Sequence, residues 1–442
     1  MSTTDDIQKE ASEILSQYLR CNTTNPPGNE TVGADFLKSV LEKEGIACEL
    51  FESAPGRVSL RAELPASDAT ADRPAILLQN HSDVVPANRE KWGVDPFGGD
   101  IRDGFIYGRG ALDMKGVGVA QLMTLILLKR RKVALKRPVI FLAAADEEQG
   151  GHQGTEWLLK NHPKKFNAAL VLDEGGLGLI ERSKKKPTFY LAVGEKGSLW
   201  VRLKVSGDPG HSSVPHPRNA NLKLLKILRK ILKPQPIRWT PPMIAMFRYL
   251  SRHEKGLKKF LMSHPKGLTY NPFFRFGLAK KLYLNATLRN TVTLTGLQSG
   301  EGVNFIPNEA SATLDIRLLP GETPEHFLEM LKTRAGPGVA WEVLSQSHPS
   351  SSPFSAKFAK TVETILHTQY PDIALAPCLI TVATDSRFYR QQGIPAYGVM
   401  PFVIDEDDLG GVHGNNERLS VENLGKGISI LFDLVKTLAT TV

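Results

Sequence analysis

The sequence predicts an α/β fold with a mainly parallel sheet, interrupted by a smaller inserted α+β domain. Short apolar runs such as Ala75–Leu78, Val139–Leu142 and Ala169–Leu172 indicate buried strands, and helix-like stretches alternate with them. From Leu199 onward the strand-like stretches instead alternate apolar and polar residues, which is typical of an antiparallel sheet with one exposed face. After Ser350-Ser351-Ser352-Pro353 the first pattern returns.

The chain therefore divides into three expected segments: the main domain covers 1–196 and 351–442, and the inserted domain covers 197–350. A first helix is expected after Thr4 or Asp5, both good N-caps. The inserted domain has the order of a ferredoxin-like βαββαβ unit, with its elements expected at Leu199–Val205, Asn221–Leu232, Thr291–Thr295, Ala310–Leu318, from Thr323 onward, and at Val339–Leu344.

Composition bounds the class of protein. At 442 residues, with 41% apolar and 23% charged residues, the chain is long enough for two domains with an ample core. Three scattered cysteines imply no disulfide framework, and the polar start, Met1–Asp6, lacks the features of a signal peptide. No segment is long and apolar enough to span a membrane. We therefore expect a cytoplasmic protein.

The net charge is +9, and basic runs include Lys129–Lys132 and Lys184–Lys186. Such charge can indicate a patch for nucleic acid or for an anionic membrane. It can equally be a solvated surface that attracts anionic substrates. No nucleic-acid module motif accompanies the charge, so the second interpretation is favoured, and neither a nucleic acid nor a membrane is expected as a partner.

Five metal-capable side chains follow strand-like apolar runs: His81, Asp113, Glu148, Asp173 and His413. In open α/β sheets, sites form beyond the carboxyl ends of the strands. Imidazoles and carboxylates collected at one such edge suit two divalent ions better than one. This set predicts hydrolysis by metal-bound hydroxide.

Two pairs of closely spaced residues give further information about this site. Because His81 and Asp83 are two residues apart on an extended strand, they point to the same side, and the carboxylate can fix the imidazole tautomer. The alternative is a turn-forming Asp beside a core His. Adjacent Glu147 and Glu148 can diverge, one toward a metal and the other toward a shared water, unless they are simply a solvated acidic pair.

These motifs resemble the M20 metallopeptidases, the group of aminoacylases, carnosine dipeptidases and glutamate carboxypeptidases. The resemblance covers most of the chain: His-Ser-Asp at 81–83, Gly-Arg-Gly-x-x-Asp-x-Lys-Gly at 108–116, Asp-Glu-Glu at 146–148, Gly-His-Ser-Ser-x-Pro at 210–215, Asn-Phe-Ile-Pro at 304–307, Asp-Ile-Arg-Leu-Leu-Pro-Gly at 315–321 and Val-His-Gly-Asn-Asn-Glu at 412–417.

The resemblance implies roles for the metal-binding residues. Asp113 bridges two metals, and the peptide bond that follows it is cis. Glu148 and His413 complete one metal shell, and Glu147 is the general base. His81 and Asp173 complete the other shell; Glu174 is the competing candidate beside Asp173, which we prefer.

It also implies roles in the inserted domain, which becomes a lid and dimerisation domain. His211 stabilises the oxyanion, often in the active site of the partner subunit. Asn304 and Arg317 bind the carbonyl or carboxylate of the substrate. For Arg317 the alternative is an ordinary surface position on a strand.

The segment of about 233–286 lies outside the motifs that carry this resemblance and is basic and aromatic. Its aromatic residues predict either a helical hairpin that extends the core of the lid or an apolar wall for the acyl group of a substrate. Aromatic stripes more often form core, which favours the hairpin.

The predicted function is that of a dinuclear zinc-dependent amidohydrolase or peptidase, with Co²⁺ or Mn²⁺ as substitutes. It cleaves a peptide or N-acyl amide bond next to a free carboxylate. Whether it is a carboxypeptidase, a dipeptidase or an N-acyl-amino-acid hydrolase stays open, and a homodimer through the lid is a candidate assembly. The alternatives are a non-catalytic metal-binding scaffold and a basic nucleic-acid-binding protein.

Overall fold

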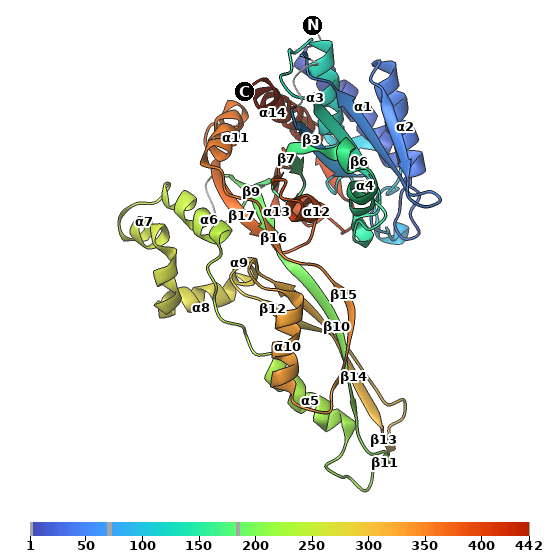
Figure 1. Ribbon diagram of the computed structural model, residues 1–442, viewed down its shortest axis with the longest axis vertical. Coiled ribbons are helices and arrows are strands. Elements are labelled where there is room, and N and C mark those ends of the chain that lie inside the picture. Colours follow the sequence, from blue (N-terminus) through green and yellow to red (C-terminus); the bar gives the residue numbers. More distant parts are fainter. Residues whose placement is uncertain (1–2, 69–72, 183–185, 442) are drawn as a thin grey trace. The chain divides into compact units, whose positions relative to one another are not determined.

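The structure, a computed structural model, describes residues 3–68, 73–182 and 186–441 (Figure 1). Lys184 and Lys185 of the second basic run lie outside the described residues. The chain forms two compact units: unit 1 comprises 1–193, 352–378 and 384–442, and unit 2 comprises 194–351 and 379–383. The short segment 379–383 was expected in the main domain but belongs to unit 2.

The large sheet of unit 1 has parallel strands at its centre. In the order β6-β3-β7-β18, each neighbouring pair is parallel, and their bounds are β6 Val139–Ala144, β3 Ala75–His81, β7 Ala168–Asp173 and β18 Ala396–Gly398. Every residue of β3 and β6 is buried, as expected for strands covered on both faces. The parallel core of the predicted fold is therefore present.

Most pairs at the flanks of this sheet are antiparallel, although the edge strand β19 pairs with β8 in parallel, so the whole sheet is mixed. The outer and peripheral strands are β1 Cys48–Glu52, β2 Val58–Leu64, β9 Thr188–Glu195, β8 Gly178–Ile180, β19 Val403–Asp405, β16 Ser350–Ser351 and β17 Ala374–Ile380. The connections between β1 and β2 and between β8 and β9 are too short for a crossover helix, so these pairs form hairpins. A three-stranded sheet of β4 Ile101–Arg102, β5 Phe105–Tyr107 and β20 Arg418–Ser420 completes the strands of the unit.

Helices pack around this sheet. The first helix, α1, begins at Thr4 with Thr3 as its N-cap, one residue earlier than expected, and Thr3 and Asp6 form a capping box. Helix α3 is buried along almost its whole length and contacts α1 and α14. The helices of unit 1 are α1 Thr4–Arg20, α2 Thr31–Lys43, η1 Arg89–Lys91, α3 Lys115–Arg130, η2 Glu147–Gln149, α4 Thr155–Asn161, η3 Pro163–Phe166, α11 Ala356–Gln369, α12 Ser386–Gln391, α13 Glu406–Leu409 and α14 Val421–Thr440.

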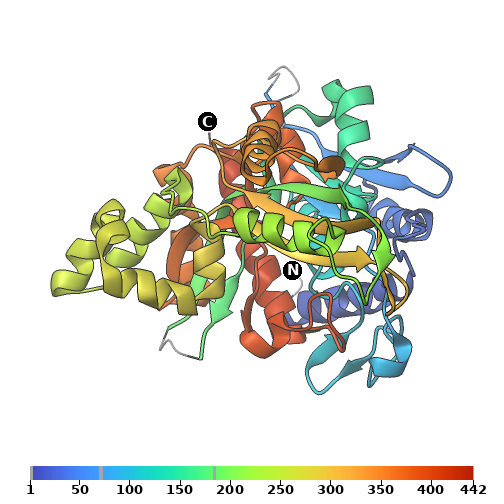
Figure 2. The same cartoon turned by 90° about the horizontal axis from the view of Figure 1, so that it is seen from below.

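Unit 2 contains the predicted βαββαβ arrangement. Its four-stranded sheet has the order β12-β14-β10-β15, with α5 and α10 on one face (Figures 1 and 2). The bounds are β10 Gly197–Ser206, α5 Ala220–Ile231, β12 Thr291–Ser299, β14 Glu309–Leu318, α10 Pro324–Ala335 and β15 Ala340–Gln346, and a two-stranded ribbon joins β11 Gly210–His211 to β13 Phe305–Ile306. Alternate residues of β10 are buried, which matches the alternation in the sequence.

The segment between α5 and β12 is helical but is not a hairpin. It forms α6 Pro241–Ser251, α7 Gly256–Ser263, η4 Pro265–Tyr270, α8 Pro272–Lys280 and α9 Leu282–Thr287. Met243, Phe247, Leu268 and Leu278 of this segment form an apolar cluster with Leu319 and Leu379, which differs from the core between α5, α10 and the sheet. The segment therefore adds a second apolar cluster to unit 2, as a helical subdomain of several short helices rather than as the expected hairpin.

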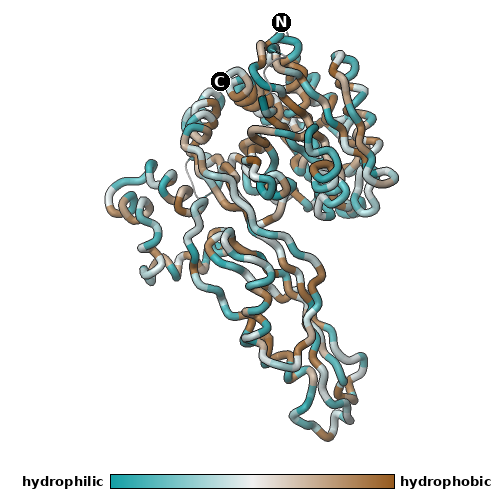
Figure 3. Tube along the Cα trace, viewed as in Figure 1, coloured by the Kyte–Doolittle hydropathy of each residue, from teal (hydrophilic) through white to brown (hydrophobic). Residues whose placement is uncertain are grey.

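The central strands carry apolar stretches, whereas apolar and polar residues are mixed in the helices of 241–287 (Figure 3). None of the helices within the described residues has the length and apolar character needed to cross a bilayer.

Candidate metal centre

Three adjacent parallel strands end at one edge of the sheet in unit 1 and bring the predicted metal-binding residues together. Strand β3 ends at His81, β6 ends just before the turn with Glu147 and Glu148, and β7 ends just before Glu174. The carboxyl ends of parallel strands meet at the same edge, where sites form in open α/β sheets.

Asp113 lies between two histidines. Its Oδ1 is 3.1 Å from His81 Nε2, and its Oδ2 is 3.1 Å from His413 Nε2. Glu174 Oε1 is 3.9 Å from His81 Nε2, and Glu148 Oε2 is 3.4 Å from His413 Nε2. Two groups of potential ligands share the Asp113 carboxylate, which is the arrangement of a bridging ligand between two ions.

The structure places Glu174, rather than the preferred Asp173, with His81 and Asp113. Asp173 is the last residue of β7 and Glu174 follows it, and adjacent side chains at a strand end point to opposite sides. Asp173 is buried, and its Oδ2 accepts a hydrogen bond of 2.7 Å from the Ser386 hydroxyl. The geometry therefore favours the competing candidate Glu174 over Asp173 as the third member of this group.

Asp83 connects His81 to the turn with Glu147 and Glu148. Its carboxylate lies 3.5 Å from His81 Nδ1 and accepts hydrogen bonds of 3.1 Å from the backbone N–H groups of Glu147 and Glu148 and of 2.8 Å from the Asn25 amide. The His81 ring also contacts the Asp83 carbonyl oxygen at 2.9 Å. Asp83 thus orients the imidazole and fixes the turn at the same time.

The turn with Glu147 is shaped by close packing. Asp146 has φ of 71°, and Gly151 has φ of 69° with no room for a Cβ, which would lie 2.3 Å from Asp385 Oδ1. Arg387 Nη2 donates to the Gly150 carbonyl oxygen at 2.6 Å. Asp385 and Arg387 were not identified from the sequence, although they follow the strand-like run that ends at Ile380.

Glu417 joins the loop of Asp113 to the loop of His413. It is fully buried and accepts hydrogen bonds of 2.8 to 3.0 Å from the backbone N–H groups of Gly110, Leu112 and Asp113. It also accepts one of 2.7 Å from Arg109, which itself donates to the Gly414 carbonyl oxygen. The sequence showed Glu417 only as the last residue of a motif. The Asp113–Met114 peptide bond is cis, as the resemblance implied.

Burial and the crowding of carboxylates shift the titration of the site. Burial would lower the pKa of His81, but hydrogen bonds with Asp113 and Asp83 raise that pKa well above its usual value. Hydrogen bonds with Asp113 and Glu148 raise the pKa of His413 to about 10. Burial, together with Asp385 and Glu148 nearby, raises the pKa of Glu147 well above that of an exposed glutamate.

The donor set fits divalent cations. Each group of ligands combines one imidazole nitrogen with carboxylate oxygens, which zinc accepts. Without cations these carboxylates repel one another, and burial and the Asp113 charge raise the pKa of Glu174 and of Glu148. Glu148 Oε1 is buried and has no hydrogen-bond partner among the described residues. Two bound cations would compensate both features.

The predicted residues His211, Asn304 and Arg317 belong to unit 2. His211 Nδ1 accepts a hydrogen bond from the Ser213 N–H at 3.2 Å, which leaves the Nε2 proton of the neutral ring as a donor. Asn304 is exposed, and its backbone carbonyl oxygen accepts a hydrogen bond of 3.1 Å from the backbone N–H of Ser212. The Arg317 guanidinium makes a bidentate contact with Asp315, with distances of 2.8 and 3.1 Å, so only its remaining donors are available to a carboxylate.

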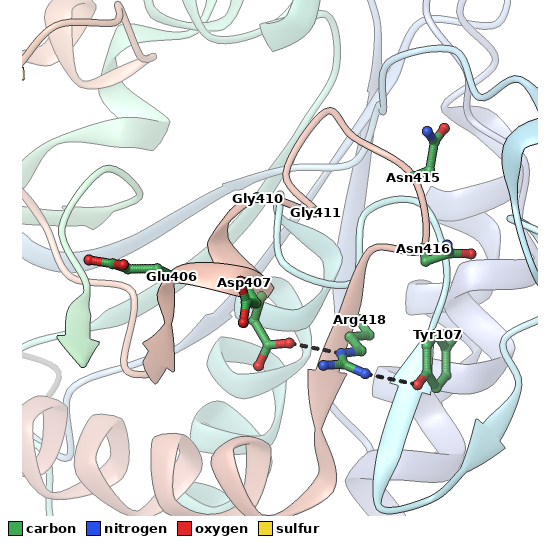
Figure 4. A pocket seen from close by; sticks show the side chains of 9 residues that line it. Tyr107, Glu406, Asp407, Gly410, Gly411, Asn415, Asn416 and Arg418 are labelled. Carbon is green, nitrogen blue, oxygen red and sulfur yellow. Dashed lines mark hydrogen bonds and ion pairs between the residues drawn. The ribbon is translucent and has the colours of Figure 1, made fainter. Parts of the chain in front are cut away.

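A pocket of about 340 Å³ lies beside the His413 loop (Figure 4). Its lining includes the acidic residues Glu406, Asp407 and Asp408. Arg418 also lines it and donates hydrogen bonds to the Asp408 carboxylate at 2.8 Å and to the Tyr107 hydroxyl at 3.1 Å. None of the metal-ligand candidates lines it. We therefore do not assign this pocket to the substrate.

Comparison with known proteins places these features in a family. The chain matches Peptidase family M20/M25/M40 over residues 77–437. It is 32% identical to human N-fatty-acyl-amino acid synthase/hydrolase PM20D1 over 98% of this chain and 88% of that protein, and 30% identical to rat aminoacylase-1B over 97% and 95%. The M20 metallo-carboxypeptidase Sso-CP2 from Sulfolobus solfataricus has the same fold, with a TM-score of 0.74, 22% identity, and coverage of 97% and 98%.

The fold and the paired ligand groups define a hydrolase that acts on amide or peptide bonds in a metal-dependent manner. The chain belongs to the M20 peptidase family.

Proposed function

We propose that this protein is a dinuclear zinc N-acyl-amino-acid hydrolase, which releases a carboxylic acid and an amino acid. The observation that carries the two-metal site is the Asp113 carboxylate, whose two oxygens face two different histidines at 3.1 Å. His81, Asp113 and Glu174 would hold one ion, and Asp113, Glu148 and His413 the other. When bound, the ions act as Lewis acids toward water and the amide carbonyl.

Glu147 is the proposed general base. Its backbone is fixed by Asp83, and its pKa is raised because it is buried beside other carboxylates. A carboxylate with a raised pKa is a stronger base, suited to accept the proton of the attacking water near neutral pH. As the C–N bond breaks, Glu147 would pass that proton to the amine nitrogen, so the base returns to its starting state.

His211 is proposed to donate its Nε2 proton to the developing oxyanion. The Ser213 N–H favours this tautomer. Arg317 and Asn304 are proposed to recognise the carboxylate and carbonyl of the substrate, although Asp315 already holds part of the Arg317 fork. These three roles rest on the M20 motifs of unit 2.

The N-acyl amino acid is favoured over a dipeptide by the relatives that match nearly the whole chain. One is named for N-fatty-acyl-amino acids, and another is an aminoacylase. The chain's three cysteines, Cys21, Cys48 and Cys378, are all free, which agrees with the proposal of a reducing, cytoplasmic location. A dipeptidase or carboxypeptidase activity is the second candidate, supported by the fold shared with a metallo-carboxypeptidase.

The test is a substrate panel with purified, zinc-loaded protein. It compares N-acetyl and N-oleoyl amino acids, their carboxamide analogues, and dipeptides with free and amidated C-termini. We expect the highest kcat/KM for N-acyl amino acids with a free carboxylate. Faster cleavage of dipeptides would contradict the proposed substrate class, and activity that survives complete chelation would contradict the metal centre itself.

A further inference from the structure

The positive charge of this protein is concentrated in one helical subdomain. Residues 241–289 contain ten Lys and Arg residues and a single acidic residue, Glu254, so the segment carries a net charge of +9. This equals the net charge of the entire chain, so the remaining 393 residues are neutral in sum. The one acidic side chain is already paired with Lys258 at 2.6 Å.

The same subdomain exposes large apolar side chains. Among the described residues, aromatic rings are exposed at seven positions, and five of them lie between 260 and 283. Two leucines join them, and each of the seven side chains is between 58% and 88% exposed: Leu257, Phe260, Tyr270, Phe273, Phe276, Leu282 and Tyr283.

Two helices of this subdomain, α7 and α8, carry apolar side chains on two sides. In α8, Phe274 and Leu278 pack inward on the apolar cluster of the subdomain, whereas Phe273 and Phe276 lie on the opposite side, three residues apart. In α7, Leu261 packs inward, whereas Leu257 and Phe260 point outward. A helix that is apolar on both sides normally has a partner on each.

The exposed cations lie among these apolar groups. Lys258 and Lys259 separate Leu257 from Phe260, and Arg275 separates two of the exposed phenylalanines. Lys280 Nζ lies 4.7 Å from the centre of the Phe276 ring. Long basic side chains can keep their charges in water while their stems and the neighbouring rings enter an apolar layer.

We propose that the outward face of α7, η4, α8 and α9 is a docking surface for an anionic lipid bilayer. Its net charge attracts acidic headgroups, and the exposed Phe, Tyr and Leu side chains enter the boundary between headgroups and acyl chains. This differs from the sequence-based expectation of a merely solvated basic surface. The proposal rests on unit 2 alone and is independent of the reaction catalysed.

A nucleic acid would account for the basic and aromatic side chains of this surface but not for its exposed leucines. Phosphates would pair with the lysines, and rings could stack on bases, but the exposed leucines would gain little from a polar, hydrated ligand. A bilayer interface receives the aliphatic and aromatic groups together with the charges.

The experiment is flotation of the full-length protein with vesicles of phosphatidylcholine alone or with about 30% phosphatidylglycerol, at low and high salt. We expect binding to the anionic vesicles only, weakened by salt. The triple variant Lys259→Gln/Lys266→Gln/Lys281→Gln should weaken the vesicle partition coefficient by about 10²-fold, because each charge near an anionic surface contributes about tenfold or less. A matched variant of unit 1, Lys132→Gln/Lys160→Gln/Lys164→Gln, removes the same charge. It should change the vesicle partition coefficient by less than about threefold.

A second pair of variants tests the apolar contribution. Tyr270→Ser/Phe273→Ser should weaken binding by at least about tenfold, whereas Ile101→Ser/Ile180→Ser, also exposed apolar positions, should not. Circular dichroism verifies that each variant is folded.

Three outcomes would overturn the proposal: no binding to anionic vesicles, equal losses in the variants and their matched controls, or tight binding to duplex DNA or RNA without any binding to vesicles.

Discussion

Glu147 and Glu148 are neighbours with different environments, and this difference supports different roles for them, Glu148 as a metal ligand and Glu147 as the general base. Glu148 lies 3.4 Å from His413, whereas neither of the two ligand groups found among the described residues includes Glu147. We predict that Glu147→Gln still binds two ions but lowers kcat by at least ~10², because the amide cannot accept a proton. Metal analysis and steady-state kinetics measure both, with exposed Glu90→Gln as the control. Loss of an ion in Glu147→Gln would show that Glu147 is a ligand.

Glu174 and Asp173 offer a second residue-level comparison. Glu174→Gln should weaken one of the two metal sites by more than ~10-fold, because it removes a charged ligand. Asp173→Asn should keep two ions, since the amide oxygen can still accept from Ser386. Metal titration by calorimetry separates them, and the opposite order of effects would restore Asp173 as the ligand.

The raised pKa values of the two histidines predict proton release on metal binding. Without metal, the protonated forms of His81 and His413 are favoured, because hydrogen bonds with carboxylates raise the pKa of His81 above its usual value and raise the pKa of His413 to about 10. A metal requires the neutral imidazole, so each histidine must lose a proton. Apparent metal affinity should therefore rise with pH toward about 10 and fall as pH decreases. Calorimetry in buffers of different ionisation enthalpy should show net proton release on metal binding at pH 7; no proton release would contradict this titration.

At the scale of elements, Glu417 fixes the loop of Asp113 relative to the loop of His413. A glutamine has only one acceptor oxygen, so Glu417→Gln leaves buried N–H groups of the Asp113 loop unpaired. We expect a loss of about 1–3 kcal/mol in the free energy of unfolding of the metal-free protein and a ~10- to 10²-fold loss of metal affinity.

Chemical denaturation and metal titration measure the two effects of Glu417→Gln. Glu422→Gln, on the exposed first turn of α14, is the matched control and should change neither quantity appreciably. Wild-type metal affinity in Glu417→Gln would show that the two loops keep their geometry without this carboxylate.

At the scale of the whole molecule, unit 2 exposes apolar side chains that bear on the proposed homodimer. Helix α5 exposes Leu222 and Leu225, and the edge strand β12 exposes Leu297 beside them. An unpaired apolar edge strand is a template for association. This surface supports the proposed homodimer.

We predict that Leu225→Lys/Leu297→Lys converts a dimer to a monomer, because two charges would then be buried in the interface. Light scattering after size exclusion measures the mass, with Val32→Lys/Leu50→Lys, at exposed positions of unit 1, as the control. A monomeric wild-type protein with full activity would eliminate any role of His211 in the site of a partner.

The sequence by itself determined the class of fold, because periodicity reports burial directly. Continuous apolar runs became the buried strands β3 and β6, and the alternating run at 199–205 became the half-exposed β10. The polar residues at strand ends gave most of the metal centre for the same reason. Parallel strands deliver their carboxyl ends to one edge, whatever the details of packing.

Only the tertiary structure decided the choice between Asp173 and Glu174 and the supporting roles of Asp385 and Glu417. These depend on contacts across hundreds of residues, such as those of Ser386 with Asp173 and of Glu417 with the Asp113 loop. It also decided which aromatic residues of 241–287 form a core and which are exposed. A short irregular helix gives no clear period, so its inward and outward faces are fixed only when it packs against its neighbours.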